Sequence, residues 1–180
     1  MTEGRPLSRI PNIYLCGLIG TGKTTIGRAL AEYLGRPFHD LDEVITAEAG
    51  ADLHALVAAE TWLGFRAREY ETVKRFAAMP GVVIGLGGGT VRYAWNRDAI
   101  KGTGTIVLLT ADIDVLAERA SIAERPRVNQ DTSQADDLKR IWEENKDTYL
   151  AAADHVYSTD AGKTVTQEVE EIAQLVGGPE

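Results

Sequence analysis

The amino-acid sequence predicts an α/β fold in which helices cover both faces of a parallel sheet. The first observation is an alternation of short apolar clusters, bounded by Gly or Asp, with longer stretches of helical periodicity. The second is a glycine-rich turn, GLIGTGKT at 17–24, that joins an apolar cluster to a helical stretch. Strands that alternate with helices form parallel sheets, because each helix returns the chain to the edge from which it started.

The predicted elements follow in a regular order. Strands are expected at 13–16, 82–86, 105–109 and 155–159, with 37–40 as a short fifth candidate. Helices are expected at 23–34, over much of 52–78, and at 112–120, 135–153 and 165–176. The polar segment of about 120–135 interrupts this order, and both a mobile lid and an ordinary surface loop fit it.

The composition is that of one acidic domain spanning residues 1–180. Apolar residues make up 44% of the chain and charged residues 26%, which is ordinary for a soluble domain with a sizeable core. The net charge is -8, with 27 acidic and 19 basic residues, and the basic residues form no run. A nucleic-acid partner is therefore not expected, and any phosphate has to be held by a local site. We expect a monomer that acts on a small molecule.

The cysteine and histidine residues give no sign of export or of a metal cluster. Cys16 is the single cysteine and cannot form a disulfide within the chain, which fits a reducing cytoplasm. No apolar stretch near the amino terminus approaches the about 20 residues of a membrane span, so we expect no membrane association. His39, His54 and His155 lack the spacing of metal ligands, and we interpret them as structural, like Cys16.

The turn at 17–24 matches the phosphate-loop pattern of Gly, four residues, Gly, Lys and Ser or Thr. Its glycines let backbone N–H groups point at phosphate oxygens, and the amino end of the following helix adds positive potential. In this pattern Lys23 supplies a charge to the terminal phosphates, and the Thr24 hydroxyl is placed to bind Mg²⁺. We therefore expect a nucleoside triphosphate with Mg²⁺. A plain glycine-rich turn is the alternative.

Two aspartates follow the short strand at 37–40. Asp40 and Asp42, in HDLD, are separated by one residue and stand where ligands collect in parallel sheets, at the carboxyl end of a strand. One carboxylate would hold metal-bound water and the other an acceptor hydroxyl. The alternative is that an aspartate caps the helix expected from about residue 43.

A glycine triplet and an arginine are further candidates. Gly87, Gly88 and Gly89 follow an apolar strand directly, and residues without side chains let a ligand touch the backbone, although a tight turn explains them equally well. Arg66 lies three residues before Glu69, on the same helical face. A solvated ion pair is the simplest interpretation of that pair taken alone.

Taken in order, these motifs resemble the shikimate kinases. The resemblance rests on GLIGTGKTT, HDLD, FRAREYE, GLGGGTV, ERPR and a late TY followed by AAD, and it runs from the first strand nearly to the end of the chain. It implies a three-layer phosphate-loop kinase fold with five parallel strands, similar to that of nucleoside monophosphate kinases, and a lid that closes over ATP.

The resemblance also implies roles on the nucleotide side. Thr24 would hold Mg²⁺, with Asp40 acting through water, and Lys23 would be catalytic. Arg125, in ERPR, would be the catalytic lid arginine on the transferring phosphate, and Arg119 a second lid contact. The residues implied to cradle the ATP phosphates are Gly20, Thr21, Gly22, Lys23, Thr24 and Thr25.

On the acceptor side, the resemblance implies that Asp42 grips the acceptor hydroxyl and takes its proton. Arg66 would pair with the substrate carboxylate and Glu69 would brace Arg66. Gly88, with Gly87 and Gly89 beside it, would contact the substrate through the backbone. Phosphoryl transfer depends mainly on alignment and charge neutralisation, so a weakly basic aspartate is sufficient there.

The match fails at one substrate-binding position. Counting back from Tyr149, the second carboxylate-binding arginine of the family falls at position 145, where this chain has Asn145. Lys146 is the nearest cation, but the next residue of a helix faces another direction. We consider Arg127 the better candidate to compensate, and Asn145 stays a predicted substrate contact.

Smaller departures from the family pattern accompany this one. The Gly-Glu pair usual before Phe-Arg is Thr61 and Trp62, and the segment before Arg125 is one residue shorter. The basic position on the adenine side falls on Gly162, with Lys163 beside it. The motifs that would bind the nucleotide phosphates are therefore intact, whereas those for the acceptor are altered.

Three hypotheses follow from this pattern. The chain is a shikimate kinase with one arginine lost or relocated, an enzyme that phosphorylates another cyclic polyol, or a nucleotide-binding regulator without catalysis. Retention of Asp42 and the glycine triplet favours catalysis, and Arg66 favours an anionic acceptor. We therefore favour transfer of the γ-phosphate of ATP to a ring hydroxyl of shikimate, giving shikimate 3-phosphate.

Overall fold

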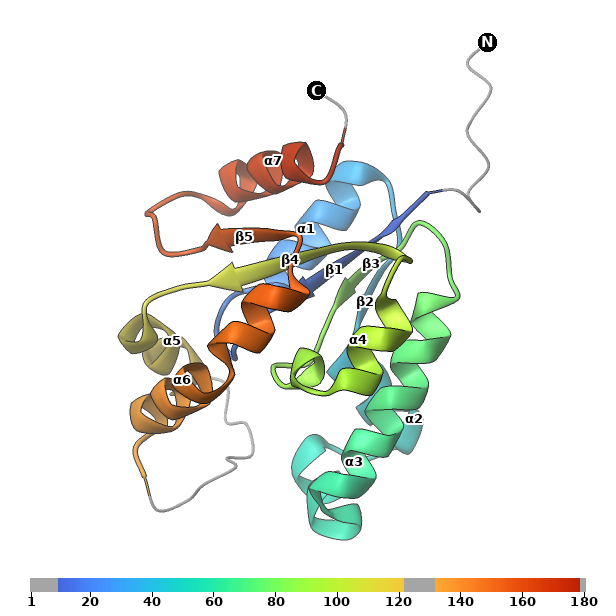
Figure 1. The fold of residues 1–180 in the computed structure, drawn as a ribbon, viewed down its shortest axis with the longest axis vertical. Helices are drawn as coiled ribbons and strands as arrows, with labels where there is room; N and C mark the ends of the chain where they lie inside the picture. Colours follow the sequence, from blue (N-terminus) through green and yellow to red (C-terminus); the bar gives the residue numbers. More distant parts are fainter. Residues whose placement is uncertain (1–9, 122–131, 179–180) are drawn as a thin grey trace.

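The sheet is built around strand β1, Asn12–Cys16, whose five residues are all buried. The computed structural model describes residues 10–121 and 132–178. The other strands are β2 (Phe38–Asp40), β3 (Val83–Gly85), β4 (Gly104–Thr110) and β5 (His155–Ser158). All pairs are parallel and the order is β2-β3-β1-β4-β5, so the predicted five-stranded parallel sheet is confirmed (Figure 1).

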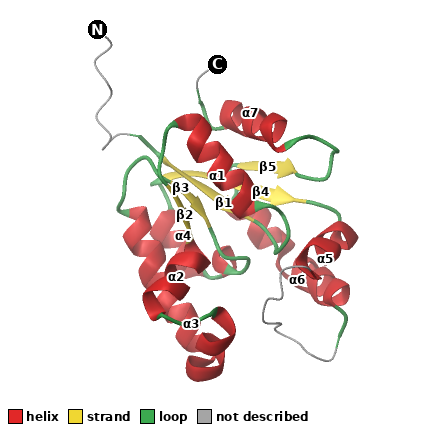
Figure 2. Cartoon of the chain, turned by 180° about the vertical axis from the view of Figure 1, so that it is seen from behind, coloured by secondary structure: helices red, strands yellow, loops and turns green. Residues whose placement is uncertain are grey.

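Helices form a layer on each face of this sheet. Helices α1 (Lys23–Leu34) and α7 (Val165–Leu175) pack on one face, where Ile13 and Leu15 of β1 point. Tyr14 and Cys16 alternate to the other face, as the period of a strand requires. The core there receives side chains from α2 (Leu41–Ala49), α3 (Leu53–Ala77), α4 (Ala94–Ile100), α5 (Ile113–Ser121) and α6 (Gln134–Ala152). Figure 2, seen from behind, shows α1 in front of the strands.

The strand register brings the three predicted motifs to one edge of the sheet. Gly85 of β3 lies opposite both Leu15 of β1 and Asp40 of β2. The three strands therefore end nearly level. The phosphate loop, the two aspartates and the glycine triplet follow these ends directly, and the triplet leads into a short 3-10 helix, η2, Thr90–Arg92.

The structure departs from the expected elements in two places. The seven-residue helix α4 was not expected, because AWNRDAI is short and lacks an apolar period, and its cap residue Tyr93 makes no capping hydrogen bond. Helix α3 is kinked at Thr61, which has φ 62° and ψ 172°, a conformation normally reserved for glycine.

The predicted lid of about 120–135 is described only at its two ends. Its first residues complete α5 and its last ones lead into α6, whereas 122–131, with Arg125 and Arg127, lie outside the described residues. Within the described ranges, no helix has the length and apolarity that a membrane span needs.

Candidate active site

The phosphate loop presents an uncapped helix amino terminus. Gly22, the N-cap of α1, has φ 91° and ψ 13°, a left-handed conformation that glycine adopts without strain. No side chain caps this terminus and no acidic residue lies in its first turn, so the first N–H groups suit an anion. The Lys23 ammonium curls over the loop and donates to the carbonyls of Gly17, at 2.9 Å, and Leu18, at 2.8 Å.

Asp40 holds the end of β2 and the start of α1 together. Its Oδ2 accepts a hydrogen bond of 2.5 Å from Thr24 Oγ1. Its Oδ1 accepts from the backbone N–H groups of Asp42 and Glu43, at 3.1 and 3.2 Å, and so caps α2. The capping alternative is therefore correct for Asp40, but the same carboxylate also meets Thr24. A hydroxyl and a carboxylate side by side are the oxygen donors that Mg²⁺ prefers.

A cavity of about 490 Å³ opens above this loop. All six residues implied to cradle the ATP phosphates line it, from Gly20 to Thr25, and so do Asp40 and Asp42. Arg119 also lines it and donates to the backbone carbonyl of Gly20 at 3.3 Å and that of Thr159 at 3.1 Å. Lys163 lines the same cavity. The structure thus brings the described residues among the predicted nucleotide-binding set together, and Arg125 lies outside the described residues.

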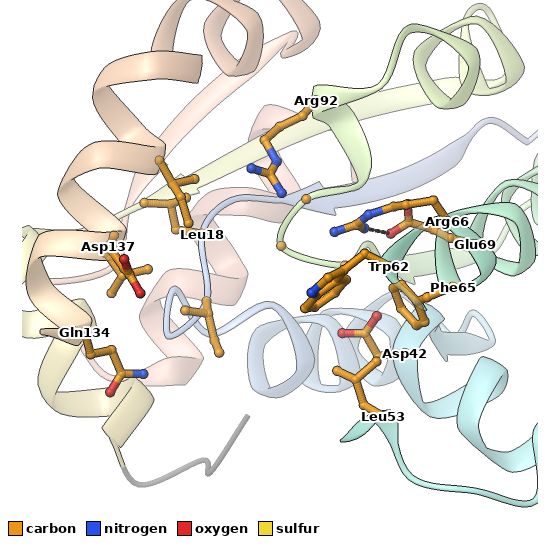
Figure 3. A pocket seen from close by; sticks show the side chains of 16 residues that line it. Leu18, Asp42, Leu53, Trp62, Phe65, Arg66, Glu69, Arg92, Gln134 and Asp137 are labelled. Atoms are coloured by element: carbon orange, nitrogen blue, oxygen red, sulfur yellow. Dashed lines mark hydrogen bonds and ion pairs between the residues drawn. The ribbon is translucent and has the colours of Figure 1, made fainter. Parts of the chain in front are cut away.

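A second cavity, of about 140 Å³, shares Ile19 and Asp42 with the first. Figure 3 shows this second cavity from close by. Its walls are mainly apolar and include Leu18, Leu53, Trp62, Phe65, Leu138 and Ile141. Arg66 and the three glycines of the triplet line it too. Asp42 lines both cavities, and it is therefore the acidic side chain that can reach a ligand in either one.

Glu69 holds Arg66 in place through an ion pair. Its side chain is fully buried, and Oε1 accepts hydrogen bonds of 2.8 Å from Arg66 Nη1 and from Thr90 Oγ1. Its Oε2 accepts from Asn96 Nδ2 at 3.1 Å. This network ties α3 to η2 and α4, so the interpretation of Arg66 and Glu69 as a solvated pair is wrong. The unexpected helix α4 supplies one of its donors.

Aromatic rings fix the rest of the Arg66 guanidinium. Its central carbon lies 5.5 Å from the ring centroid of Trp62, 5.4 Å from that of Phe65 and 5.0 Å from that of Tyr93. Cation–π contacts of this kind hold a cation with little loss of its hydrogen-bonding edge. Trp62 is a cavity residue that the sequence presents only as a departure from the family pattern.

The glycine triplet is packed against the charged groups of the cavity. A Cβ atom at Gly87 would lie 3.0 Å from Asp42 Oδ1, and one at Gly89 would lie 2.8 Å from Arg66 Nη2. None of the three glycines has a positive φ. Close approach, rather than backbone conformation, therefore explains Gly87 and Gly89, whereas a Cβ atom at Gly88 would make only ordinary contacts. A turn is present as well, since Thr90 N–H donates to Gly87 O at 3.1 Å.

Tyr149 of α6 supports the middle of the triplet. Its hydroxyl donates to the carbonyl of Gly88 at 2.5 Å, and the residue is fully buried. Burial raises the pKa of this hydroxyl well above its usual value of 10, so it remains a donor at any physiological pH.

Asn145 and Lys146 are not among the residues that line this second cavity, which the resemblance assigns to the acceptor. The Asn145 side chain donates to the carbonyl of Ile141, one turn earlier in the same helix, at 2.8 Å. Lys146 is exposed. Arg92, which the sequence analysis did not single out, does line the cavity.

The class of the protein follows from the phosphate loop, the parallel sheet and Asp42, which lines both cavities. A nucleotide cavity joined by one carboxylate to a small second cavity is the arrangement of a phosphate-loop kinase that acts on a small molecule. A family model described as shikimate kinase matches residues 19–176. The chain belongs to the shikimate kinase family.

Relatives and solved structures agree with this assignment. The shikimate kinase of Nitratidesulfovibrio vulgaris is 36% identical over 94% of this chain and 97% of its own length. That of Symbiobacterium thermophilum is 49% identical, over 61% of this chain and 63% of its own length. The structure of the Acinetobacter baumannii shikimate kinase in complex with shikimate superposes with a TM-score of 0.88, at 30% identity and 94% coverage of both chains.

Proposed function

We propose that the chain transfers the γ-phosphate of ATP to a ring hydroxyl of shikimate. The observation that carries this proposal is the position of Asp42, on the walls of both the nucleotide cavity and the acceptor cavity. A hydroxyl held by Asp42 from the acceptor side would face the terminal phosphate of a nucleotide held by the phosphate loop. The reacting atoms would then be aligned by binding alone, which is the main requirement of phosphoryl transfer.

In this proposal Asp42 orients the acceptor hydroxyl and accepts its proton late in the reaction. A carboxylate suffices for that task, since the transition state is loose and the nucleophile needs little activation. Lys23 and Arg119 would neutralise charge on the phosphates, together with Arg125. Arg66, held by Glu69, would bind the acceptor carboxylate and set the ring in the cavity.

Thr24 and Asp40 would hold a magnesium ion. Their oxygen atoms lie 2.5 Å apart at the amino end of α1, and the donor set fits a hard cation. When bound, Mg²⁺ supplies additional positive charge for the β- and γ-phosphates. The backbone hydrogen bonds to Asp40 Oδ1 keep the other carboxylate oxygen directed at Thr24.

The sequence also bears on the compartment, the oligomeric state and the partners of the enzyme. We infer a cytoplasmic monomer without a nucleic-acid or membrane partner. The net charge of -8 and the absence of a basic run support the lack of a nucleic-acid partner. The buried, unpaired thiol of Cys16 suits a reducing compartment.

The variant Asp42→Asn tests the proposed chemistry. We expect it to lose acceptor-dependent ADP release, measured in a coupled assay with shikimate, while it binds an ATP analogue as the parent does in a titration. The matched control is Asp98→Asn on α4, which lies outside both cavities and should leave turnover unchanged. Normal turnover by Asp42→Asn would show that the assignment of the acceptor site is wrong.

A further inference from the structure

The acceptor cavity contains a second arginine, which the sequence motifs did not indicate. Arg92 is the last residue of η2, the turn that directly follows the glycine triplet, and it lines the cavity. Figure 3 shows its guanidinium and that of Arg66 pointing toward the same part of the cavity from different elements. Two guanidinium groups therefore meet at one end of a cavity whose walls are mostly apolar.

The guanidinium groups of Arg66 and Arg92 both lie close to Gly89. A Cβ atom built on Gly89 would lie 2.7 Å from Arg92 Nη2 and 2.8 Å from Arg66 Nη2. Because both nitrogen atoms lie this close to the same Cβ position, the distance between them is at most the sum of these two values. Any side chain at position 89 would push the guanidiniums apart, so the third glycine of the triplet permits the pair to form.

The two arginines differ in how their charge is balanced. Arg66 Nη1 pairs with the buried carboxylate of Glu69, which leaves Nη2 beside Gly89. The side chain of Arg92 makes no hydrogen bond or ion pair with the residues that the structure describes, and its Nε is buried without a partner. A cation in a mostly apolar cavity is costly unless an anion joins it.

Apart from Glu69, which pairs with Arg66, the acidic residues of the cavity lie elsewhere. Asp42 approaches Gly87, at the other end of the triplet, and Asp137 of α6 pairs with Arg140 at 3.4 Å. The triplet thus separates a carboxylate end from an arginine end by two residues, a span of at most roughly 7 Å. A ring with a hydroxyl on one side and an anionic group on the other fits this polarity.

We propose that Arg92 is the second carboxylate-binding residue of this enzyme and takes the role that an arginine at position 145 would have. The inference rests on the proposed function, since it concerns the carboxylate of the same acceptor. Arg66 and Arg92 each offer a planar fork of N–H donors, the geometry that matches the two oxygens of a carboxylate. Asn145, by contrast, donates its amide hydrogen to its own helix.

The test compares shikimate with its neutral methyl ester in steady-state kinetics. Arg92→Met removes the charge and keeps an unbranched side chain. We expect KM for shikimate to rise about 10- to 150-fold, the range for loss of a charge-assisted hydrogen bond, with KM for ATP unchanged and kcat within a few-fold. KM for the ester should change little, because no carboxylate charge is left to lose. An equal rise for acid and ester, or none for either, would overturn the proposal.

Two further variants keep the test decisive. Arg92→Lys retains the charge without the fork, so its KM should be intermediate, and it serves if Arg92→Met does not fold. Arg75→Met is the matched control, since Arg75 is half exposed, pairs with Glu48 and lies outside the acceptor cavity. Failure of the proposed function would look different, because the unmodified protein would then not turn over shikimate at all.

A double-mutant cycle tests whether Arg92 has taken over carboxylate binding from position 145. Asn145→Arg should recover much of the lost affinity for shikimate in the Arg92→Met background, and add much less to the parent protein, because both arginines would serve one carboxylate. Equal effects of Asn145→Arg in the two backgrounds would mean that the two positions act independently, which contradicts the proposal.

Discussion

Removal of the Glu69 charge has the effect on stability that the structure predicts most clearly. Glu69 is fully buried and accepts three hydrogen bonds, from Arg66, Thr90 and Asn96. Glu69→Gln keeps the shape but replaces one carboxylate oxygen by an NH₂ group, which faces donors on every side. At the same time Arg66, itself largely buried, loses its counter-ion.

The expected cost follows from the burial of this pair. Breaking a buried ion pair from one side costs about 3 to 5 kcal/mol, and the retained shape places Glu69→Gln near the lower limit, at about 3 kcal/mol. For a chain of this length that corresponds to a fall in Tm of roughly 6 to 12 °C. KM for the acceptor should rise as well, because the Arg66 guanidinium is no longer held in place.

Urea denaturation of the ligand-free protein measures the first effect. The free energy of unfolding should fall while the m-value stays constant. Glu48→Gln is the control, since Glu48 and Arg75 form an ion pair of 2.7 Å with both side chains half exposed, and its loss should change stability by less than about 1 kcal/mol. Equal destabilisation by the two variants, or none by Glu69→Gln, would refute the reasoning.

Three other predictions concern single side chains. Thr61→Gly should stabilise the protein by about 1 kcal/mol in urea denaturation, because glycine relieves the strained conformation at the α3 kink, and Thr61→Ala should not. Burial raises the pKa of Cys16 to about 12, so its thiol stays protonated at pH 8 and should resist iodoacetamide until the protein is unfolded, as mass spectrometry would show. Tyr149→Phe removes the donor to Gly88 O and should cost about 1 to 3 kcal/mol of stability and raise the acceptor KM, whereas unchanged values would argue against support of the triplet.

The sequence was sufficient for the features that depend on local patterns. The alternation of strands and helices predicted the parallel sheet, and the phosphate loop predicted the nucleotide cavity, because spacing along the chain determines both. The glycine triplet lines the second cavity, next to Asp42 and Arg66, and its contact with the acceptor stays a prediction. The close approach of Asp42 to Gly87 and of Arg66 to Gly89 is visible only in three dimensions.

Other parts of the site depend on tertiary packing that leaves no local signal. Arg92 reaches the cavity because a single 3-10 turn follows the triplet and directs it inward, and nothing in the letters TVR indicates that turn. Helix α4 is short and has no capping side chain, yet it supplies Asn96 to the Glu69 network. Arg125 and Arg127 lie outside the described residues, so their assigned roles stay predictions.

Acceptor-dependent ADP release by the unmodified protein shows whether its acceptor is shikimate. The measurement compares shikimate with cyclitols that lack a carboxylate, at saturating ATP and Mg²⁺. We predict saturable turnover on shikimate with a KM below about 1 mM, in the usual range for a metabolic enzyme, and little or none on the cyclitols. A cyclitol used as well as shikimate, or no turnover on any acceptor, would contradict the account.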